Sequence, residues 1–451
     1  MSAASPLYFW VKTDYIERMK SLLRKFAPKF LMSWYHLSWA VLGAILYGFP
    51  ARKMIVIGVT GTDGKSTTTE TITRIFKEAG LKTCSTSSVW FQIGDRKWKN
   101  KLKMGMPGRM FLQKFLRQAL SEGCTHAVIE VSSEGILQNR HRFLNFHTAV
   151  ITNLSPEHIE RHGSFEKYRA EKQKLFRVTQ KVHVVNIDDE NGQYFLQIPA
   201  KQTYAYGLQK APSLPNVTRY LSAENIIERR DGTSFQVNGK EFQLKLIGKF
   251  NTYNALSAIC VGLAHKISME TCKDALVKME RMPGRTDPVI EKPFVVLVDY
   301  AVTPKALENL YGGVRRLFEP KKLICVFGAC GGGRDKWKRP ILGKIASSYC
   351  DTIILTNEDP YDEDPNQILF EVESGLSRAE SRDKTKDFNV HKILDRREAI
   401  HKALAIAQEG DVVVVSGKGS EDAIAVAGGK KIPWDERKVI EEEFAKLYKK
   451  A

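Results

Sequence analysis

The sequence has no internal repeat and no low-complexity tract, and its seven cysteines are odd in number and show no CxxC spacing. Cysteines without such spacing, set mostly in apolar or glycine-rich surroundings, predict a reducing, cytosolic compartment. The first apolar stretch comes late and no small-residue cleavage site follows it, so we expect no cleavable signal peptide. Acidic residues are also scarce, with 51 Asp and Glu against 69 Lys and Arg, a net charge of +18. This excess favours an anionic partner, namely a nucleotide, a nucleic acid or an acidic lipid face.

The composition is that of a core-forming protein. Hydrophobic residues make up 43% and charged residues 27% of the 451 positions, which excludes a disordered tail, a peptide hormone and a multi-span transporter. At the usual domain size this length predicts about three domains.

One apolar segment lies near the N-terminus. Residues 30–50 contain no Asp, Glu, Lys or Arg, and the stretch before them carries Lys20, Arg24, Lys25 and Lys29. Three interpretations stay open: a helix packed on the next domain, a peripheral membrane contact through residues 16–50, and a membrane-spanning helix.

After Pro50 short apolar runs alternate with helix-length amphipathic segments, which is typical of βαβ units. The first runs cover residues 54–58, 127–131, 149–152 and 182–186, and turn signals between 201 and 246 predict a β-rich annex. A second series follows at 294–299, 323–328, 352–356 and 411–416. We therefore predict an α/β protein with a helical appendage (1–50), a central domain with a mainly parallel sheet plus the annex (51–283), and a Rossmann-like α/β C-terminal domain (284–451).

The strongest local signal is a glycine-rich loop between the first strand and a helix. Glycines let backbone N–H groups face phosphate oxygens, Lys65 reaches the terminal phosphates, and the Ser66 hydroxyl suits Mg²⁺. Five residues rather than four separate Gly58 from Gly64, a small departure from the usual spacing. This P-loop predicts a nucleoside triphosphate held by Gly61, Thr62, Asp63, Gly64, Lys65, Ser66 and Thr67.

Two further residues follow strands of the same predicted sheet. Glu130 ends one strand, and His158 lies just beyond another. Because the carboxyl ends of parallel strands meet at one edge, we expect both near the P-loop, where they and Ser66 make a candidate Mg²⁺ shell.

A series of motifs in order along the chain resembles the Mur ligases, most closely the branch that adds the third amino acid to UDP-N-acetylmuramoyl-dipeptide. The series runs from about residue 53 to 440 and comprises GVTGTDGKST, EVSSEG, TNLSPEHIERHGSFEKYRAEKQKLF, LIGKFNTYNAL, MPGR, DYAVTP, FGACGGGRDKWKRP, TNEDPYDEDP and SGKGSED. The resemblance implies ATP-dependent amide ligation through an acyl phosphate. It also implies that Lys172, in the pattern Tyr-x-x-x-Lys-x-x-Leu-Phe, is carbamylated and supports a second Mg²⁺.

The resemblance assigns roles to matched positions. Catalysis falls to Lys65, Glu130, His158 and Lys172, and the metal ligands are Ser66, Glu130, His158 and carbamylated Lys172. On the nucleotide side it implies Asn251, Asn254, Arg285 and Asp299. On the substrate side it implies Ser132, Ser133, Arg140, Arg334, Lys336, Arg339, Asp359, Gly417 and Glu421.

Several positions depart from the family pattern. Glu134, Val302 and Ser420 each replace a histidine, and Glu358-Asp359-Pro360-Tyr361 replaces Asp-Asn-Pro-Arg, whose arginine pairs with the distal carboxylate of meso-diaminopimelate. The acids Glu358, Asp359, Asp362, Glu363 and Asp364 would suit a side-chain ammonium, so we expect L-lysine or another diamino acid unless this run is a solvated loop.

We also expect no counterpart of the family's uridine-binding N-terminal domain in residues 1–50, which show no obvious nucleotide site. A basic stretch with Arg96, Lys97, Lys99, Lys101, Lys103 and Arg109 is either a compensating diphosphate site or solvated surface. A lipid-linked acceptor is therefore a further hypothesis.

The sequence thus predicts a Mg²⁺- and ATP-dependent acid–amino acid ligase that acts on an anionic muramoyl-peptide precursor in peptidoglycan synthesis. We expect a cytoplasmic monomer, either free or peripheral at the inner membrane face. A folylpolyglutamate synthase-like ligase, a ligase with a lipid-linked or non-UDP acceptor, and a non-catalytic binding subunit remain alternatives. We expect no nucleic-acid partner. A P-loop nucleic-acid translocase, the class that the positive charge would favour, gives Lys172 no role in its reaction.

Overall fold

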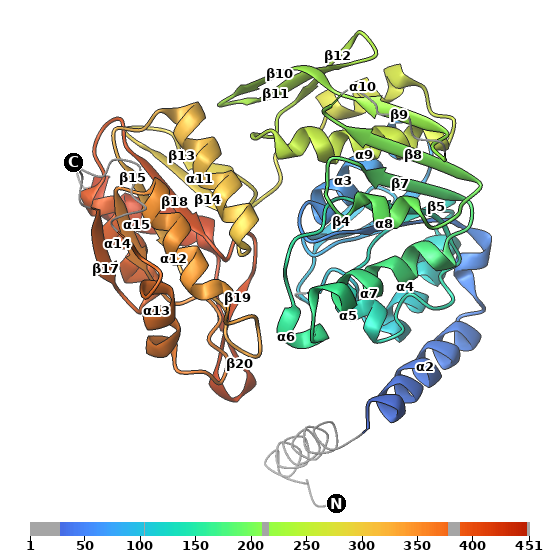
Figure 1. The fold of residues 1–451 in the computed structure, drawn as a ribbon, viewed down its shortest axis with the longest axis horizontal. Helices are drawn as coiled ribbons and strands as arrows, with labels where there is room; N and C mark the ends of the chain where they lie inside the picture. Colours follow the sequence, from blue (N-terminus) through green and yellow to red (C-terminus); the bar gives the residue numbers. More distant parts are fainter. Residues whose placement is uncertain (1–27, 103, 210–215, 378–387, 449–451) are drawn as a thin grey trace, which may run out of the picture.

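Two parallel-dominated sheets, each built from its own stretch of chain, form the body of the protein (Figure 1). The computed structural model describes residues 28–102, 104–209, 216–377 and 388–448. Residues 55–222 contribute the strands of the larger sheet and residues 287–416 those of the second, so the predicted α/β class is confirmed. The predicted domain boundary at 283/284 falls between the last helix of the first half and the first strand of the second.

The larger sheet has nine strands in the order β4-β3-β2-β5-β1-β6-β7-β8-β9. Its central strands are buried apolar runs, as expected for parallel strands covered on both faces. Among the described pairs only β2–β3 and β3–β4 are antiparallel, so β3 is the reversed strand. The bounds are β1 Ile55–Thr60, β2 Thr83–Thr86, β3 Trp90–Ile93, β4 Arg96–Lys99, β5 His126–Glu130, β6 Phe146–Ile151, β7 Val182–Asn186, β8 Gln202–Gly207 and β9 Arg219–Ser222.

Alternate residues of β1 point into two separate cores. Ile57 and Val59 pack with α3 and α9, whereas Val56 packs on the opposite face with α4 and α7. This period of two is what a strand between two helical layers requires. The helices of this half are α3 Lys65–Glu78, α4 Arg109–Ser121, α5 Ser133–Leu137, α6 Ile159–His162, α7 Phe165–Val178, α8 Gly192–Leu196, α9 Phe250–Ala264 and α10 Met269–Val277.

The predicted annex is smaller than expected. The prediction for 201–246 was wrong for β8 and β9, because β8 pairs in parallel with β7 and β9 with β8, which extends the main sheet. Five of the six residues of β8 are buried there, so this strand belongs to the core. The annex itself is the antiparallel sheet of β10 Glu224–Arg229, β11 Gly232–Val237 and β12 Lys240–Leu244.

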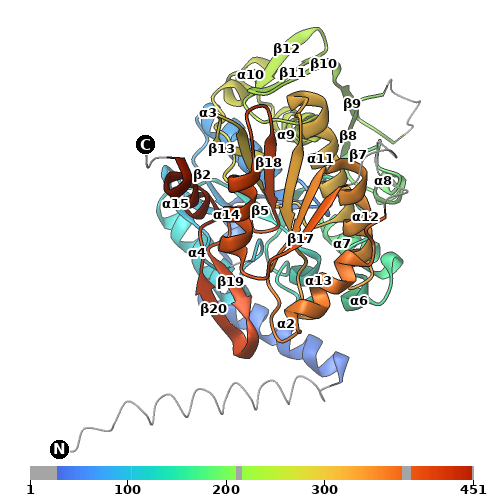
Figure 2. The same cartoon turned by 90° about the vertical axis from the view of Figure 1, so that its left-hand side faces the viewer.

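The second sheet has the order β13-β14-β18-β15-β16-β17, with only β13 antiparallel among its described pairs. One face packs on α11–α13 and the other on α14 and α15 (Figure 2). The strands are β13 Asp287–Ile290, β14 Val295–Asp299, β15 Leu323–Phe327, β16 Thr352–Leu355, β17 Asn389–Lys392 and β18 Val412–Ser416, followed by the hairpin β19 Ala423–Val426 and β20 Lys430–Pro433. The helices are α11 Pro304–Phe318, α12 Lys338–Tyr349, α13 Pro365–Glu373, α14 Arg396–Ile406 and α15 Glu436–Tyr448.

The apolar N-terminal segment forms helix α2, Lys29–Leu46, which runs along α4. Small residues make this approach possible: Ala40 and Ala44 are buried, and a Cβ on Gly43 would lie 3.0 Å from Met110 Sδ. None of the helices in the described ranges combines the length and apolar character that a membrane span requires. The predicted contact segment 16–50 is covered only from residue 28 onward, because residues 16–27 lie outside the described part.

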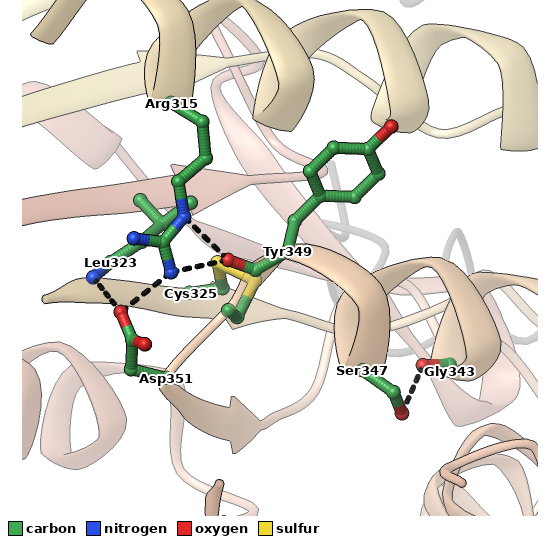
Figure 3. Close-up of a disulfide and its surroundings, with 8 residues drawn as sticks. Arg315, Leu323, Cys325, Gly343, Ser347, Tyr349 and Asp351 are labelled. Carbon is green, nitrogen blue, oxygen red and sulfur yellow. Dashed lines mark hydrogen bonds and ion pairs between the residues drawn. A yellow bond between two sulfur atoms is a disulfide. The ribbon is translucent and has the colours of Figure 1, made fainter. Parts of the chain in front are cut away.

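Two cysteines of the C-terminal half are paired. A disulfide joins Cys325 on β15 to Cys350 at the end of α12, whose Cα atoms lie 6.1 Å apart (Figure 3). The expectation of a reducing compartment did not include this bond, because the fold rather than the sequence spacing brings the two residues together. The Arg315 guanidinium fastens the same corner by bonding Tyr349 O and Asp351 Oδ2. The other five cysteines are free thiols.

Candidate active site

The P-loop occupies the turn between β1 and α3, and its glycines are sterically required. Gly61 has φ +149°, and a Cβ there would lie 1.8 Å from Thr152 Oγ1. Gly64 has φ +80°, and its Cβ would lie 2.3 Å from Asn254 Oδ1. Asn153 braces the loop, because its Oδ1 accepts from Asp63 N at 2.9 Å. The loop therefore presents its backbone at a helix N-terminus, the arrangement that binds phosphate.

Lys172 lies beneath this loop. Its side chain rises from α7, is 1% exposed, and donates to Gly61 O at 2.7 Å. Burial, together with the positive charge of Lys65, holds the pKa of the Lys172 ammonium well below its usual range. The amine is thus held at the P-loop in an environment that favours its neutral form.

Two oxygen groups that suit a metal ion meet at the first turn of α3. Ser66 Oγ donates to Glu130 Oε2 at 2.7 Å, and Ser88 N donates to the same oxygen at 2.9 Å. The described residues hold no cluster of three or more His, Cys, Asp or Glu side chains that could bind a metal by themselves. A hydroxyl and a carboxylate nevertheless fit Mg²⁺, which takes few protein ligands and completes its shell with water and phosphate oxygens.

His158 sits in a left-handed backbone conformation, φ 57°, just before α6. Burial lowers the pKa of His158 to about 2, with a second contribution from the positive charge of Arg334. Arg334 Nη1 donates to His158 Nδ1 at 3.4 Å. The imidazole is therefore neutral and can act as an acceptor or ligand.

Arg334 belongs to the second half of the molecule, and further contacts cross the interface between the two halves, here called the seam. Lys338 on α12 donates to both carboxylate oxygens of Glu157, at 2.8 and 3.0 Å. Asp335 accepts from the N–H groups of Ile159 and Glu160, at 3.1 and 2.9 Å. Three residues of the second half, Arg334, Asp335 and Lys338, thus contact the segment around His158 across the seam.

A cavity of about 2020 Å³ lies between the two sheets. Its wall includes the P-loop, Glu130 and His158 from the first half, and residues that follow β14, β15, β16 and β18 in the second. Ligands of open parallel sheets collect at these carboxyl ends. The other predicted residues on the wall are Thr67, Ser132, Ser133, Arg140, Asn254, Arg285, Asp299, Arg334, Asp359 and Glu421.

Charged side chains on the second half of the wall are paired. Lys418 is fully buried and donates to Asp359 Oδ1 at 2.9 Å and to Glu421 Oε2 at 2.5 Å. Glu358 is 3% exposed, and its Oε1 accepts from the Cys330 thiol at 2.9 Å. Burial raises the pKa of Glu358. The wall therefore presents carboxylates held in defined positions.

Six predicted residues do not reach the cavity wall, and two of them, Gly61 and Lys172, lie in and beneath the P-loop. The Arg339 prediction needs correction, because its fully buried guanidinium binds Glu363 and Glu371 and stabilises α12. Lys336 is exposed and pairs with Glu363 at 3.4 Å. Asn251 is buried behind Asn254, from whose Nδ2 it accepts at 3.0 Å. Gly417, with φ +108°, turns the chain beside Glu358.

The basic stretch does not form a convergent anion site in its described part. Lys97 pairs with Glu70 at 2.6 Å and Arg96 with Glu122 at 2.9 Å. Arg109 donates to Gln138 O and contacts His36 of α2. Lys103 lies outside the described residues.

Sequence reasoning missed Lys338, Glu157, Asp335 and Lys418. All four lie within the quoted motifs TNLSPEH, GGGRDKWKRP and SGKGSED, but only the fold reveals their partners. Their burial as charged residues is the signal that marks them in the structure.

Comparisons with known proteins agree with this geometry. Residues 59–262 match the Mur ligase middle domain, and residues 284–419 match the Mur ligase, glutamate ligase domain. A UDP-N-acetylmuramoyl-L-alanyl-D-glutamate--2,6-diaminopimelate ligase of Syntrophomonas wolfei is 37% identical over 412 residues, which cover 89% of this chain and 81% of that protein. A UDP-N-acetylmuramyl-tripeptide synthetase of Roseiflexus is 38% identical over 431 residues, which cover 90% and 82%.

Solved structures give the same result for the fold. One of a UDP-N-acetylmuramoyl-L-alanyl-D-glutamate--2,6-diaminopimelate ligase superposes with a TM-score of 0.57 at 27% identity, over 87% of this chain and 78% of the other. Folylpolyglutamate synthase of Mycobacterium tuberculosis, at 16% identity, shares the fold with a TM-score of 0.66 over 84% and 92%. The chain is a ligase and belongs to the Mur ligase family.

Proposed function

We propose that this ligase joins an amino acid to a muramoyl-peptide acceptor at the expense of ATP, in the synthesis of peptidoglycan. The observation that carries the proposal is the convergence of Lys65, Glu130 and His158 with Arg334 and Glu421 on one cavity wall. The names of the relatives, which describe amino acid addition to UDP-N-acetylmuramoyl peptides, support the same assignment.

The first step activates the acceptor. A carboxylate oxygen of the acceptor attacks the γ-phosphorus of ATP, the bond to the β,γ-bridging oxygen breaks, and ADP leaves with an acyl phosphate formed. Lys65 and the P-loop N–H groups are placed to hold the phosphates, and Mg²⁺ held through Ser66 and Glu130 would neutralise developing charge.

The second step forms the amide. The amine nitrogen of the incoming amino acid attacks the acyl carbon, gives a tetrahedral intermediate, and loses a proton as inorganic phosphate departs. The neutral His158 is an acceptor close to this region, and Arg334 can stabilise the oxyanion.

Lys172 fits carbamylation. Addition of its neutral amine to CO₂ forms an N–C bond and releases one proton, which turns a cation into a carboxylate-like ligand. The burial of Lys172 and its position beside Lys65 favour the neutral amine that this reaction needs. The product would remove the repulsion between two ammonium groups at the P-loop and provide an oxygen ligand for a second Mg²⁺.

For the incoming amino acid we propose L-lysine or a similar diamino acid. Three of the five acids in the 358–364 run are committed elsewhere: Asp362 accepts from Gly428 N, Glu363 pairs with Arg339, and Asp364 caps α13. Asp359 is already paired with Lys418. Glu358 lines the cavity and accepts from the neutral Cys330 thiol, so we propose it as the carboxylate that receives a side-chain ammonium. Tyr361 takes the sequence position of the arginine that would bind a distal carboxylate.

The test is an amino acid panel offered with Mg²⁺-ATP and UDP-muramoyl-dipeptide, with phosphate release and product mass as readouts. We expect turnover with L-lysine or L-ornithine well above that with meso-diaminopimelate. Glu358→Gln should raise KM for the diamino acid about tenfold or more, whereas the nearby Asp362→Asn should not. Preferred turnover of meso-diaminopimelate would overturn the amino acid assignment, and glutamylation of a folate would overturn the function.

The carrier of the acceptor peptide is a separate proposal. Helix α2 precedes the ATP-binding half in the chain and exposes large apolar side chains, so we include a lipid-linked muramoyl-peptide among the acceptors. Competition between UDP-linked and lipid-linked precursors measures this directly, and turnover of the UDP-linked compound alone would exclude the lipid-linked one.

A further inference from the structure

Helix α2 presents a broad apolar face that the described part of the chain leaves uncovered. The outer face of α2 comprises Leu31, Trp34, Tyr35, Trp39, Leu42, Ile45 and Leu46, with exposed fractions from 39% for Trp39 to 69% for Trp34. These positions recur every three or four residues along 18 residues of helix, so they form one continuous stripe. A stripe of large apolar side chains on this scale marks an interaction surface rather than ordinary scatter.

The other side of the helix is fixed to the protein. Ala40 and Ala44 are buried against α4, Arg109 contacts His36, and Asn139 Nδ2 donates to Ser33 O at 3.3 Å. Because these contacts hold α2 by its inner side, the outer face cannot turn inward without breaking them. Figure 1 shows α2 at the periphery of the first half, away from the second sheet.

The charge around α2 identifies the partner. No Asp or Glu occurs from residue 18 to residue 62, while the sequence places Lys20, Arg24, Lys25 and Lys29 before the apolar stripe. Arg52 and Lys53, just after the helix, are exposed. Two tryptophans and a tyrosine among aliphatic residues, flanked by cations and free of acids, are typical of a helix that lies in the headgroup region of an anionic bilayer.

We infer that the outer face of α2 docks on the surface of an anionic lipid bilayer, with the helix lying in the plane of the interface. The dimensions agree with the absence of a candidate span among the described helices, since an interfacial helix needs one apolar face rather than a full crossing. Docking does not depend on the proposed reaction.

Docking would also fix how the cavity lies relative to the membrane surface. Asn139, which bonds α2, directly precedes Arg140, and Arg140 lines the cavity on the side where Ser132 and Ser133 lie. The membrane would therefore lie near the part of the cavity wall that the family resemblance assigns to the acceptor peptide. A lipid-linked or membrane-proximal precursor would reach this part of the wall with a shorter search, a consequence that rests on the proposed function.

The test is co-sedimentation of the full-length protein with vesicles of phosphatidylcholine alone or with about 30% phosphatidylglycerol. The double variant Trp34→Ser/Ile45→Ser removes two exposed side chains of the outer face. Phe370→Ser/Ile432→Ser is the matched control, because these residues are 60% and 50% exposed but lie in the C-terminal half. Ligase activity with a water-soluble acceptor is measured in parallel.

We expect binding to the anionic vesicles that weakens in high salt, falls about tenfold or more in the α2 variant, and persists in the control. Failure of the wild-type protein to bind anionic vesicles would overturn the inference, as would equal losses in both variants. It would also be overturned if ultracentrifugation showed that the outer face joins two copies of the chain and no vesicles bind. Unchanged activity in the α2 variant separates docking from catalysis, so either proposal can fail without the other.

Discussion

The ion pair between Lys338 and Glu157 offers the sharpest test of how the two halves form one site. Both side chains are at most 8% exposed, and two hydrogen bonds of 2.8 and 3.0 Å join them across the seam. Lys338→Met keeps an unbranched side chain, one heavy atom shorter, and removes its charge. Removing one partner of a buried pair costs about 3–5 kcal/mol, because the other charge is left without compensation.

The size of this effect follows from the state of Glu157. Burial already raises the pKa of Glu157, and Lys338 opposes that rise. Without Lys338 the pKa of Glu157 will rise further, and protonation of the carboxylate then limits the loss of free energy to the lower part of this range. At about 1.4 kcal/mol per factor of ten, 3 kcal/mol corresponds to a decrease of roughly 100-fold in the population of docked halves.

The assay is amino-acid-dependent phosphate release, reported as kcat/KM, for Lys338→Met, Glu157→Gln and the double variant. We expect each single variant to lose about two orders of magnitude and the double variant to recover most of the loss, because it buries no unpaired charge. The melting temperature should change little, since the pair joins two halves that each have their own core.

Two results would refute this reasoning. A Lys338→Met enzyme within about threefold of wild type would mean that the pair contributes nothing to docking. Multiplicative losses in the double variant would mean that Lys338 and Glu157 act independently, with Lys338 bound to a substrate instead of to Glu157.

Three further predictions address other parts of the molecule. Lys172→Ala should lower kcat at least about 100-fold, and removal of bicarbonate should slow the wild-type enzyme. Lys174→Ala, on the exposed side of α7, should keep kcat near the wild-type value. Equal losses in the two variants would contradict a special role for Lys172. Burial lowers the pKa of His265 to about 3 from an ordinary 6.5, so folding favours the neutral ring. The free energy of unfolding should therefore fall as the pH drops below about 6.5, by up to about 1.4 kcal/mol per pH unit. In urea unfolding, the His265→Asn variant should lose less stability than the wild type over this acidic range. Cys350→Ser opens a loop of 25 residues and should lower stability by about 2–4 kcal/mol under oxidising conditions, while an effect that persists under reducing conditions would assign the loss to packing rather than to the bond with Cys325.

The elements that the sequence predicted well are those with local causes. The P-loop is a strand, a glycine turn and a helix within one short stretch, so its geometry depends on neighbouring residues. Glu130 was placed correctly beside Ser66, because a residue at the carboxyl end of a parallel strand must lie at that edge of the sheet. The strand at residues 182–186 was predicted with its observed bounds, since an apolar run buried on both faces leaves no choice of face.

Features that depend on distant pairs were not predictable in the same way. Glu157 and Lys338 are 181 residues apart, and a charged residue within a motif does not reveal its partner. Arg339 was assigned to the substrate because it shares a motif with Arg334, yet it lies in the first turn of α12 and points into the protein, where Glu363 and Glu371 neutralise it. For α2, an apolar sequence without a polar side could not indicate which face packs on α4.

The contacts around His158 bear on how much ATP the proposed reaction would use without forming product. Asp335 of the second half accepts from the first turn of α6, and Arg334 of the same half donates to His158, so this geometry uses groups from both halves. In the proposed reaction, an acyl phosphate formed without these contacts would be exposed to hydrolysis, and ATP would be used without product. Contacts from both halves around His158 would then tie the use of ATP to formation of the amide bond.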